Sequence, residues 1–160
     1  MRRRELLLAG AAAVVARPAA AAAATLAHDG DVIEPLIARE EAARFVYRGA
    51  VPRGAHDLAE HAREHAAALR TQLQALGRYA PPLSAGDLDP LARRFEEAST
   101  AQARLDAAVA LEADLVTTYR AAVEQLTQPG ILQTAATILA GHAQQHAILA
   151  RLAGQDPFGG

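Results

Sequence analysis

The chain carries one pattern of acidic, aromatic and histidine residues twice, and this repeat constrains its fold more than any other feature. The stretches "EEAARFVYRGAV", from Glu40, and "EADLVTTYRAAV", from Glu112, both place a Tyr-Arg pair seven residues after a glutamate and end in Ala-Val. Farther along the chain, each is followed by a stretch with two histidines four residues apart, first "LAEHAREHAAAL" and then "LAGHAQQHAILA". The sequence therefore predicts two copies of one structural unit.

The residues around these motifs favour helices. Alanine and leucine dominate, both are strong helix formers, and only 4% of the residues are aromatic. Clusters of proline and glycine divide the chain into predicted helices over residues 31–49, 57–76, 90–126 and 131–153. The third is expected to break near Ser99 and Thr100, where a hydroxyl can cap its longer half. Short connections favour antiparallel neighbours, whereas the longer connection over residues 77–89 can cross the length of a bundle. We expect an all-α fold, an antiparallel four-helix bundle built from two helical hairpins.

The first 24 residues are typical of an export signal. They begin with arginines, continue with an apolar run over residues 6–16 and end in small residues suited to a signal peptidase. Arg3 and Arg4, followed by leucines, resemble the twin-arginine motif, so we expect export to the periplasm or the cell exterior by that pathway. The alternatives are a disordered basic N-terminus and a membrane anchor, although the run falls short of the roughly 20 residues of a span. We divide the chain into a signal (1–24) and a bundle domain (25–160).

The bundle domain is mildly acidic. Residues 25–160 hold 12 arginines and 17 acidic residues, which gives a net charge of −5. Nothing in this balance supports nucleic-acid binding, which needs a clustered basic face, and membrane contact is expected only through the signal segment. The chain has no cysteine, which excludes thiolate metal sites and cysteine nucleophiles. The partners that we consider for the domain are a metal ion and further copies of the same chain in a homo-oligomer.

Both repeated glutamates lie on apolar faces of their predicted helices. Spacings of three, four or seven residues align Glu40 with Ile33, Leu36, Ile37, Ala43 and Tyr47. The same spacings align Glu112 with Leu105, Ala108, Val109, Leu115, Val116 and Tyr119. An ionised carboxylate that faces a core is costly unless it is paired or bound to a cation. Pairing with an arginine, or turning toward solvent, is the simpler alternative for either glutamate.

The paired histidines also lie on apolar faces. His65 aligns with Leu58, Ala62 and Leu69, and His146 aligns with the equivalent residues of the last helix. Residues four apart on a helix have Cβ atoms about 5 to 6 Å apart, so two imidazoles can share one ion. Neutral imidazole is also the commonest metal ligand, although a core histidine hydrogen-bonded to a neighbour is the alternative for each. The predicted metal site comprises Glu40, His61, His65, Glu112, His142 and His146.

The motifs occur in the order glutamate helix, histidine helix, long connection, glutamate helix, histidine helix. In this order the chain resembles the ferritin-like superfamily, which includes rubrerythrins, bacterioferritins and ferritins. Its members are four-helix bundles in which a Glu from each of two helices and a Glu-x-x-His from each of the other two hold two metal ions. Rubrerythrin-like members carry a tyrosine seven residues after the first type of glutamate, as Tyr47 and Tyr119 do here. The resemblance covers nearly all of the domain. Within the superfamily, the whole chain resembles most the small exported bacterial members that carry a twin-arginine signal. Because these tyrosines lie two turns from the glutamates, we expect them to be hydrogen-bond partners or packing residues rather than ligands.

The histidine helices depart from the family pattern. The Glu three residues before each second histidine would fall at Ala62 and Ala143, so both carboxylates that normally bridge the metals are missing. With a shifted register in the last helix, His142 would take the place of the lost Glu and Gln145 that of the His. The sequence leaves both registers open.

Two glutamates and four histidines predict chemistry different from that of a di-iron centre. They supply only two negative charges and suit one transition-metal ion, such as Fe, Zn, Cu, Ni or Mn, or a looser pair of ions. We expect His65 and His146 to contribute most. The expected function is metal binding by an exported ferritin-like protein. The alternatives are a metal-free structural or interaction module and a di-iron oxidase or peroxidase, so whether the protein is an enzyme stays open.

Overall fold

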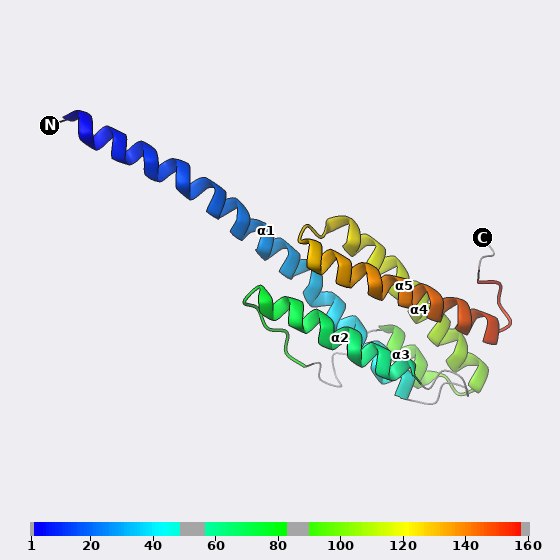
Figure 1. Ribbon diagram of the computed structural model, residues 1–160. Helices are drawn as coiled ribbons and strands as arrows, with labels where there is room; N and C mark the ends of the chain where they lie inside the picture. Colours follow the sequence, from blue (N-terminus) through cyan, green and yellow to red (C-terminus); the bar gives the residue numbers. More distant parts are fainter. Residues whose placement is uncertain (1, 49–56, 83–89, 158–160) are drawn as a thin grey trace.

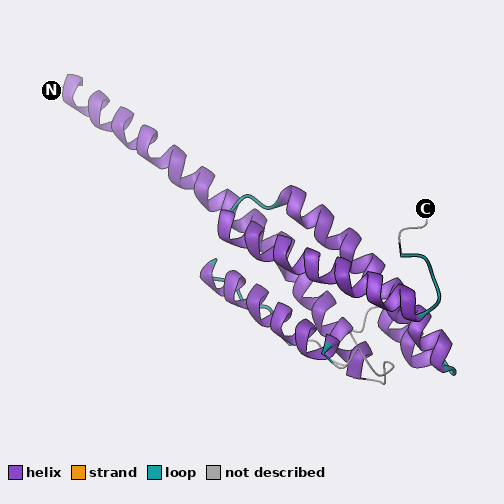
Figure 2. Ribbon diagram, turned by 45° about the vertical axis from the view of Figure 1, so that its right-hand side comes forward, coloured by secondary structure: helices purple, strands orange, loops and turns teal. Residues whose placement is uncertain are grey.

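Helices form all the regular secondary structure in the part of the chain that we describe. The computed structural model describes residues 2–48, 57–82 and 90–157. These ranges contain five helices and no strand (Figures 1 and 2): α1 (Arg2–Arg48), α2 (Leu58–Ala75), α3 (Pro90–Glu97), α4 (Ala101–Gln125) and α5 (Pro129–Leu152). The all-α prediction is confirmed, and α2 and α5 lie within two residues of their predicted bounds. Residues 83–89 of the predicted crossover lie outside the described residues.

The first helix begins far upstream of the predicted residue 31, so that predicted start is wrong. α1 continues from Arg2 through the predicted export signal to Arg48, and its N-terminal half extends beyond the other helices in Figure 1. Residues 19–24 are all alanine, the residue type with the highest helix propensity. This run explains why the helix does not start later. The helix continues through Gly30, and the side chain of Arg78 packs against this glycine. A Cβ at Gly30 would lie 2.6 Å from Nη1 of that arginine.

The predicted break in the third helical region is confirmed. Thr100 has an extended backbone and its hydroxyl accepts the backbone N–H of Ala103 at 3.1 Å, which caps the start of α4. The short α3 therefore ends before this cap and packs against α4 and α1 as a separate helix.

The helices pack chiefly as two pairs, α1 with α2 and α4 with α5, and weaker contacts of α1 with α4 and of α2 with α5 join the pairs. The core between them is made of aliphatic side chains at helical spacing. Its largest fully buried members include Ile33, Leu36, Leu69, Leu73, Leu111, Leu115 and Leu149.

Two sets of polar contacts connect the elements at one end of the bundle. Arg78, just after α2, donates to Asp31 and Glu34 of α1 at 2.5 and 2.6 Å.

The second set of contacts joins α1 to the connection between α4 and α5. The carboxylate of Asp29, fully buried on α1, accepts the backbone N–H groups of Thr127 at 3.0 Å and Gln128 at 2.9 Å. A buried carboxylate needs such donors, and the peptide groups just before a helix need acceptors. Asp29 thus satisfies the N–H groups of the two residues that precede α5, whose N-cap, Gln128, makes no capping hydrogen bond with its own side chain.

Candidate metal centre

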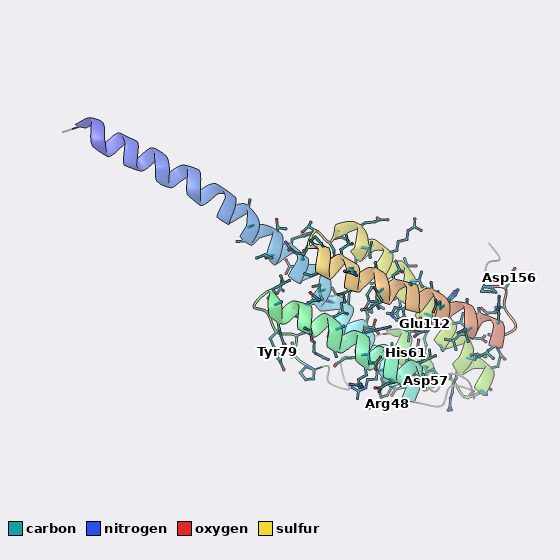
Figure 3. The ribbon with its side chains drawn as sticks, in the orientation of Figure 1. Arg48, Asp57, His61, Tyr79, Glu112 and Asp156 are labelled. Carbon is teal, nitrogen blue, oxygen red and sulfur yellow. The ribbon has the colours of Figure 1, made fainter. Side chains whose placement is uncertain are left out.

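Three ionisable side chains lie in the centre of the helices with almost no exposure. Glu40 of α1 and Glu112 of α4 are 0% exposed, and His142 of α5 is 1% exposed; Glu112 is labelled in Figure 3. The two glutamates take these positions because they lie on the apolar faces of their helices, as the spacing predicts. Burial of such groups is tolerated only where they pair with one another or with a ligand.

His142 bridges the two glutamates. Its Nδ1 lies 2.9 Å from Oε2 of Glu112, and its Nε2 lies 2.8 Å from Oε1 of Glu40. Burial alone would lower the pKa of His142, but the hydrogen bonds and the charges of Glu112 and Glu40 outweigh it and raise the pKa from 6.5 to about 9. In this arrangement both ring nitrogens carry protons at neutral pH and donate to the two carboxylates. Burial also raises the pKa of Glu40, yet the contacts with His142 and His65 outweigh it and lower the pKa below 4.5.

Each glutamate also accepts a tyrosine hydroxyl from the other pair of helices. Tyr119 of α4 donates to Oε1 of Glu40 at 2.6 Å, and Tyr47 of α1 donates to Oε1 of Glu112. Burial and the neighbouring carboxylate charges raise the pKa of both phenols well above 10, so both stay protonated as donors. Of the two predicted roles, hydrogen-bond partner or packing residue, both tyrosines have the first, and their partners are the glutamates. Each tyrosine, however, contacts the glutamate of the other copy of the motif rather than its own.

His65 of α2 completes a group of three potential ligands. Its Nδ1 lies 3.5 Å from Oε2 of Glu40, which is too long for a good hydrogen bond. Within the described residues, these two buried atoms have no hydrogen-bond partner. One ligand atom each from Glu40, His65 and His142 lies within 4.8 Å of the other two. A carboxylate and two imidazoles that converge in this way fit a single transition-metal ion.

Comparison with known proteins bears on this geometry. The family model described as "Ferritin-like domain" matches residues 36–155, which is most of the chain and includes every residue of the group. The chain belongs to the ferritin-like domain family. Searches of curated proteins and of solved structures gave no significant match.

Membership in the ferritin-like family makes the register of α5 informative. In this helix His142 and Gln145 are buried, whereas His146 is only half-buried and Ala143 is exposed. The residues in the positions of the family's inward-facing Glu-x-x-His are therefore His142 and Gln145, which is the shifted register. The expectation that His146 would contribute more than His142 is wrong for the geometry, because His146 does not belong to the group of converging ligands.

The other histidine helix keeps the unshifted register. Ala62 is buried and His65 is partly buried, so Ala62 stands where ferritin-like proteins carry the bridging glutamate. His61, labelled in Figure 3, is exposed, and its Nδ1 lies 3.0 Å from Nε2 of Gln145. His61 therefore lies at the edge of the group, beside Gln145 and with its ring stacked on that of His65 at a centroid distance of 6.5 Å.

Gln145 lies near this ferritin-like centre, although the six predicted site residues did not include it. The signal that finds it is the spacing of buried residues along α5, Ile138, His142, Gln145 and Leu149, which follows steps of four, three and four. His146 lies one position away from this series, and a one-residue step turns about 100° around a helix. This series of buried positions identifies His142 as the buried histidine and His146 as the half-buried one, which the His-x-x-x-His spacing alone does not do.

Proposed function

We propose that this ferritin-like protein binds one divalent transition-metal ion in its core, held by Glu40, His65 and His142. The observation that carries the proposal is the convergence of these ligand atoms within 4.8 Å in a buried position. Oε2 of Glu40 and Nδ1 of His65 are buried and have no hydrogen-bond partner within the described residues. Buried polar atoms without partners are rare and call for a missing partner, which a cation would supply to both at once.

The balance of buried charge also supports a bound cation. Two carboxylates and one imidazolium would carry a net charge of −1 at a place where Glu40, Glu112 and His142 are at most 1% exposed. A divalent ion bound to a neutral His142 would bring the same site to zero. Because uncompensated buried charge is costly, the metal-bound form is the better neutralised one.

Glu112 orients the site in this proposal rather than binding the metal. Its Oε2 accepts the Nδ1 hydrogen of His142 at 2.9 Å, which leaves Nε2, 2.8 Å from Oε1 of Glu40, as the nitrogen available to a metal. Metal-binding histidines commonly donate their second ring N–H to a carboxylate in this way, which fixes the ring and its tautomer. Tyr47 holds Glu112 in place, and Tyr119 does the same for Glu40.

The donor set indicates which ions fit. One carboxylate and two imidazoles suit Zn²⁺ or Fe²⁺, and Cu²⁺ or Mn²⁺ can also occupy such sites, in each case with coordination positions left for water or a small ligand. Such an ion supplies Lewis-acid chemistry when bound. A di-iron oxidase or peroxidase is not the function that we propose, because Ala62 and His142 stand where two bridging carboxylates would be needed.

Metal analysis combined with matched histidine variants tests the proposal. Protein purified from its export compartment should contain about one ion per chain, and chelator-treated protein should take up Zn²⁺ or Co²⁺ to the same ratio. His65→Ala and Glu40→Gln should abolish uptake. His61→Ala and His146→Ala, each one helical turn from a proposed ligand, should retain it. Uptake below about a tenth of an ion per chain, or equal loss in all four variants, would refute the proposal.

A metal-free structural module is the second candidate, and the bridging position of His142 favours it. Protonated His142 already gives each buried glutamate a charged donor, so the core can be held together without a metal. In that case chelators and added metals would leave the melting temperature unchanged. A rise in melting temperature with Zn²⁺ or Co²⁺ that His65→Ala removes would exclude it.

The proposal also includes the location and the helix arrangement. We infer an antiparallel four-helix bundle, with α3 lying in the crossover between its second and third members, because α1 packs mainly on α2 and α4 mainly on α5. We further infer export by the twin-arginine pathway, supported by Arg3, Arg4 and the apolar run that follows. Replacing both arginines by lysine should leave an unprocessed precursor in the cytoplasm. Among the described residues, no helix combines the length and apolar character needed to cross a membrane.

A further inference from the structure

A groove on the surface between α2 and α5 ends at one of the proposed ligands. It has a volume of about 380 Å³ and is lined by Glu64, His65, Ala68, Gln133, Thr134, Thr137 and Ile138. The side chain of His65 is 19% exposed, whereas those of Glu40 and His142 are 0% and 1% exposed. Of the three converging residues, His65 is thus the one that meets both the core and the groove.

The orientation of His65 makes this link specific. Its Nδ1 lies on the side of Glu40, 3.5 Å from Oε2, and its ring packs edge-on against that of His142 with centroids 5.1 Å apart. The opposite part of the ring passes Gly141 of α5, where an added Cβ would lie 3.7 Å from Cε1 and 3.8 Å from Nε2. The absence of a side chain at Gly141 therefore leaves room beside Nε2 of His65, the ring nitrogen that does not face Glu40.

The walls of the groove present oxygen atoms. Thr134 and Thr137 donate their hydroxyl hydrogens to carbonyls of their own helix, both at 2.9 Å, which leaves their oxygen atoms as acceptors. The oxygen of Thr134 accepts the side-chain amide of Gln72 at 3.2 Å with one lone pair, so a cation would meet its second lone pair and the oxygen of Thr137. Glu64 adds an exposed carboxylate. Hydroxyl and carboxylate oxygens suit a hydrated divalent cation, which can exchange its water for them step by step.

We propose that this groove is the route by which a hydrated divalent metal ion reaches the core, with His65 as the first imidazole that it meets. The inference rests on the metal-binding function proposed above and adds the path, the order of contact and the charge that guides the ion. Glu64 raises the local concentration of cations at the mouth, and His65 passes the ion to Glu40 and His142 behind it.

Adjacent alanines on α2 provide a matched test. Ala68 lines the groove, and its neighbour Ala67 is exposed but does not line it. Ala68→Trp should slow both Co²⁺ uptake by the chelator-treated full chain and Co²⁺ release to a chelator by about tenfold or more, because an obstructed path raises both barriers equally. The dissociation constant should therefore stay within about twofold of that of the unaltered protein. Ala67→Trp should change neither rate.

Absorption of bound Co²⁺ in a stopped-flow instrument measures uptake, and thermal unfolding checks that both tryptophan variants fold. Equal uptake rates in Ala68→Trp and Ala67→Trp would overturn the route while leaving the metal site intact. No uptake by the unaltered protein would instead overturn the proposed function itself. If Ala68→Trp fails to fold, Thr137→Leu, which narrows the other wall, replaces it with the same expected slowing.

The charge contribution has its own readout. Glu64→Gln should reduce the association rate by about two- to threefold at low salt, and the difference should shrink as ionic strength rises. Glu124→Gln, which removes an exposed glutamate on α4, serves as the control and should have no effect on uptake. Equal effects of the two variants would show that the net charge of the protein, rather than this groove, attracts the ion.

Discussion

Tyr119 on α4 donates its hydroxyl to Glu40 on α1 at 2.6 Å, so that a tyrosine of one helix pair holds the glutamate of the other. Tyr47 on α1 makes the reciprocal contact with Glu112 on α4. Because each glutamate depends on a donor from the opposite pair, neither pair alone can form the complete centre. Formation of the polar core therefore requires that the two helix pairs dock against each other.

Loss of the Tyr119 hydroxyl should weaken both stability and metal binding. Tyr119→Phe leaves Glu40 with one fewer donor in a buried position, which should lower the free energy of unfolding by about 1 to 3 kcal/mol. Urea denaturation of the metal-free protein measures this change, and Zn²⁺ titration measures the accompanying loss of affinity. Tyr79→Phe is the matched control, because Tyr79 is 68% exposed. Equal stability of the two variants would show that the hydroxyl of Tyr119 does not hold Glu40.

The metal-free protein should lose stability as the pH rises above 6.5. The pKa of His142 is about 9 in the folded chain against 6.5 ordinarily, so its stabilising contribution is complete below pH 6.5 and disappears as pH approaches and passes 9. The total change is about 3 kcal/mol. Below pH 4.5 the lowered pKa of Glu40 acts in the opposite sense, since its contribution is lost as pH falls. Urea denaturation from pH 5 to 9.5 with a chelator present measures the profile, and a flat profile would contradict it.

Removal of His142 should be far more costly than removal of His146. His142→Ala leaves Glu40 and Glu112 buried without the cation that bridges them, and breaking a buried ion pair in this way costs about 3 to 5 kcal/mol. His146→Ala, one turn away and half-buried, should cost less than about 1 kcal/mol. Thermal unfolding with a chelator present compares them. A larger loss in His146→Ala would indicate that the unshifted register of α5 is the correct one.

Two glycine substitutions should have effects of opposite sign. Gly141 lies inside α5, where a Cβ meets only the ring of His65 at ordinary contact distance, so Gly141→Ala should raise stability by about 0.5 to 1 kcal/mol. Gly77 follows α2 with φ of 73°, which an alanine adopts only with strain, so Gly77→Ala should lower stability by about 1 kcal/mol. Melting temperatures provide the comparison. A fall in the melting temperature of Gly141→Ala would mean that the space beside His65 is closed.

The positions of the buried glutamates could be predicted from the sequence because helical periodicity determines which face a residue occupies. Glu40 and Glu112 each lie in an apolar series three, four and seven residues apart, and each is fully buried. The capped start of α4 at Thr100 was predictable for a similarly local reason, since a hydroxyl at that position satisfies a free N–H within the same turn.

The partners within the centre could not be predicted in the same way. The His-x-x-x-His spacing is equally compatible with either histidine of α5 facing inward, and the choice depends on how α5 packs against the other helices. Which glutamate each tyrosine contacts is likewise decided between helices, because Tyr47 and Glu112 are 65 residues apart. The early start of α1 was not predicted because residues 1–24 were assigned to an export signal and the first helix of the domain was placed after them, although the alanine-rich sequence sustains one continuous helix.

Asp29 sets a limit on maturation of the N-terminus. Its buried carboxylate accepts the peptide N–H groups of Thr127 and Gln128, so a peptidase that cut after it would leave both groups without their acceptor and open a polar gap at that end of the bundle. A processing enzyme that removes the predicted leader must therefore cut within the exposed alanine-rich stretch upstream, before Asp29. From that residue onward, α1 belongs to the domain.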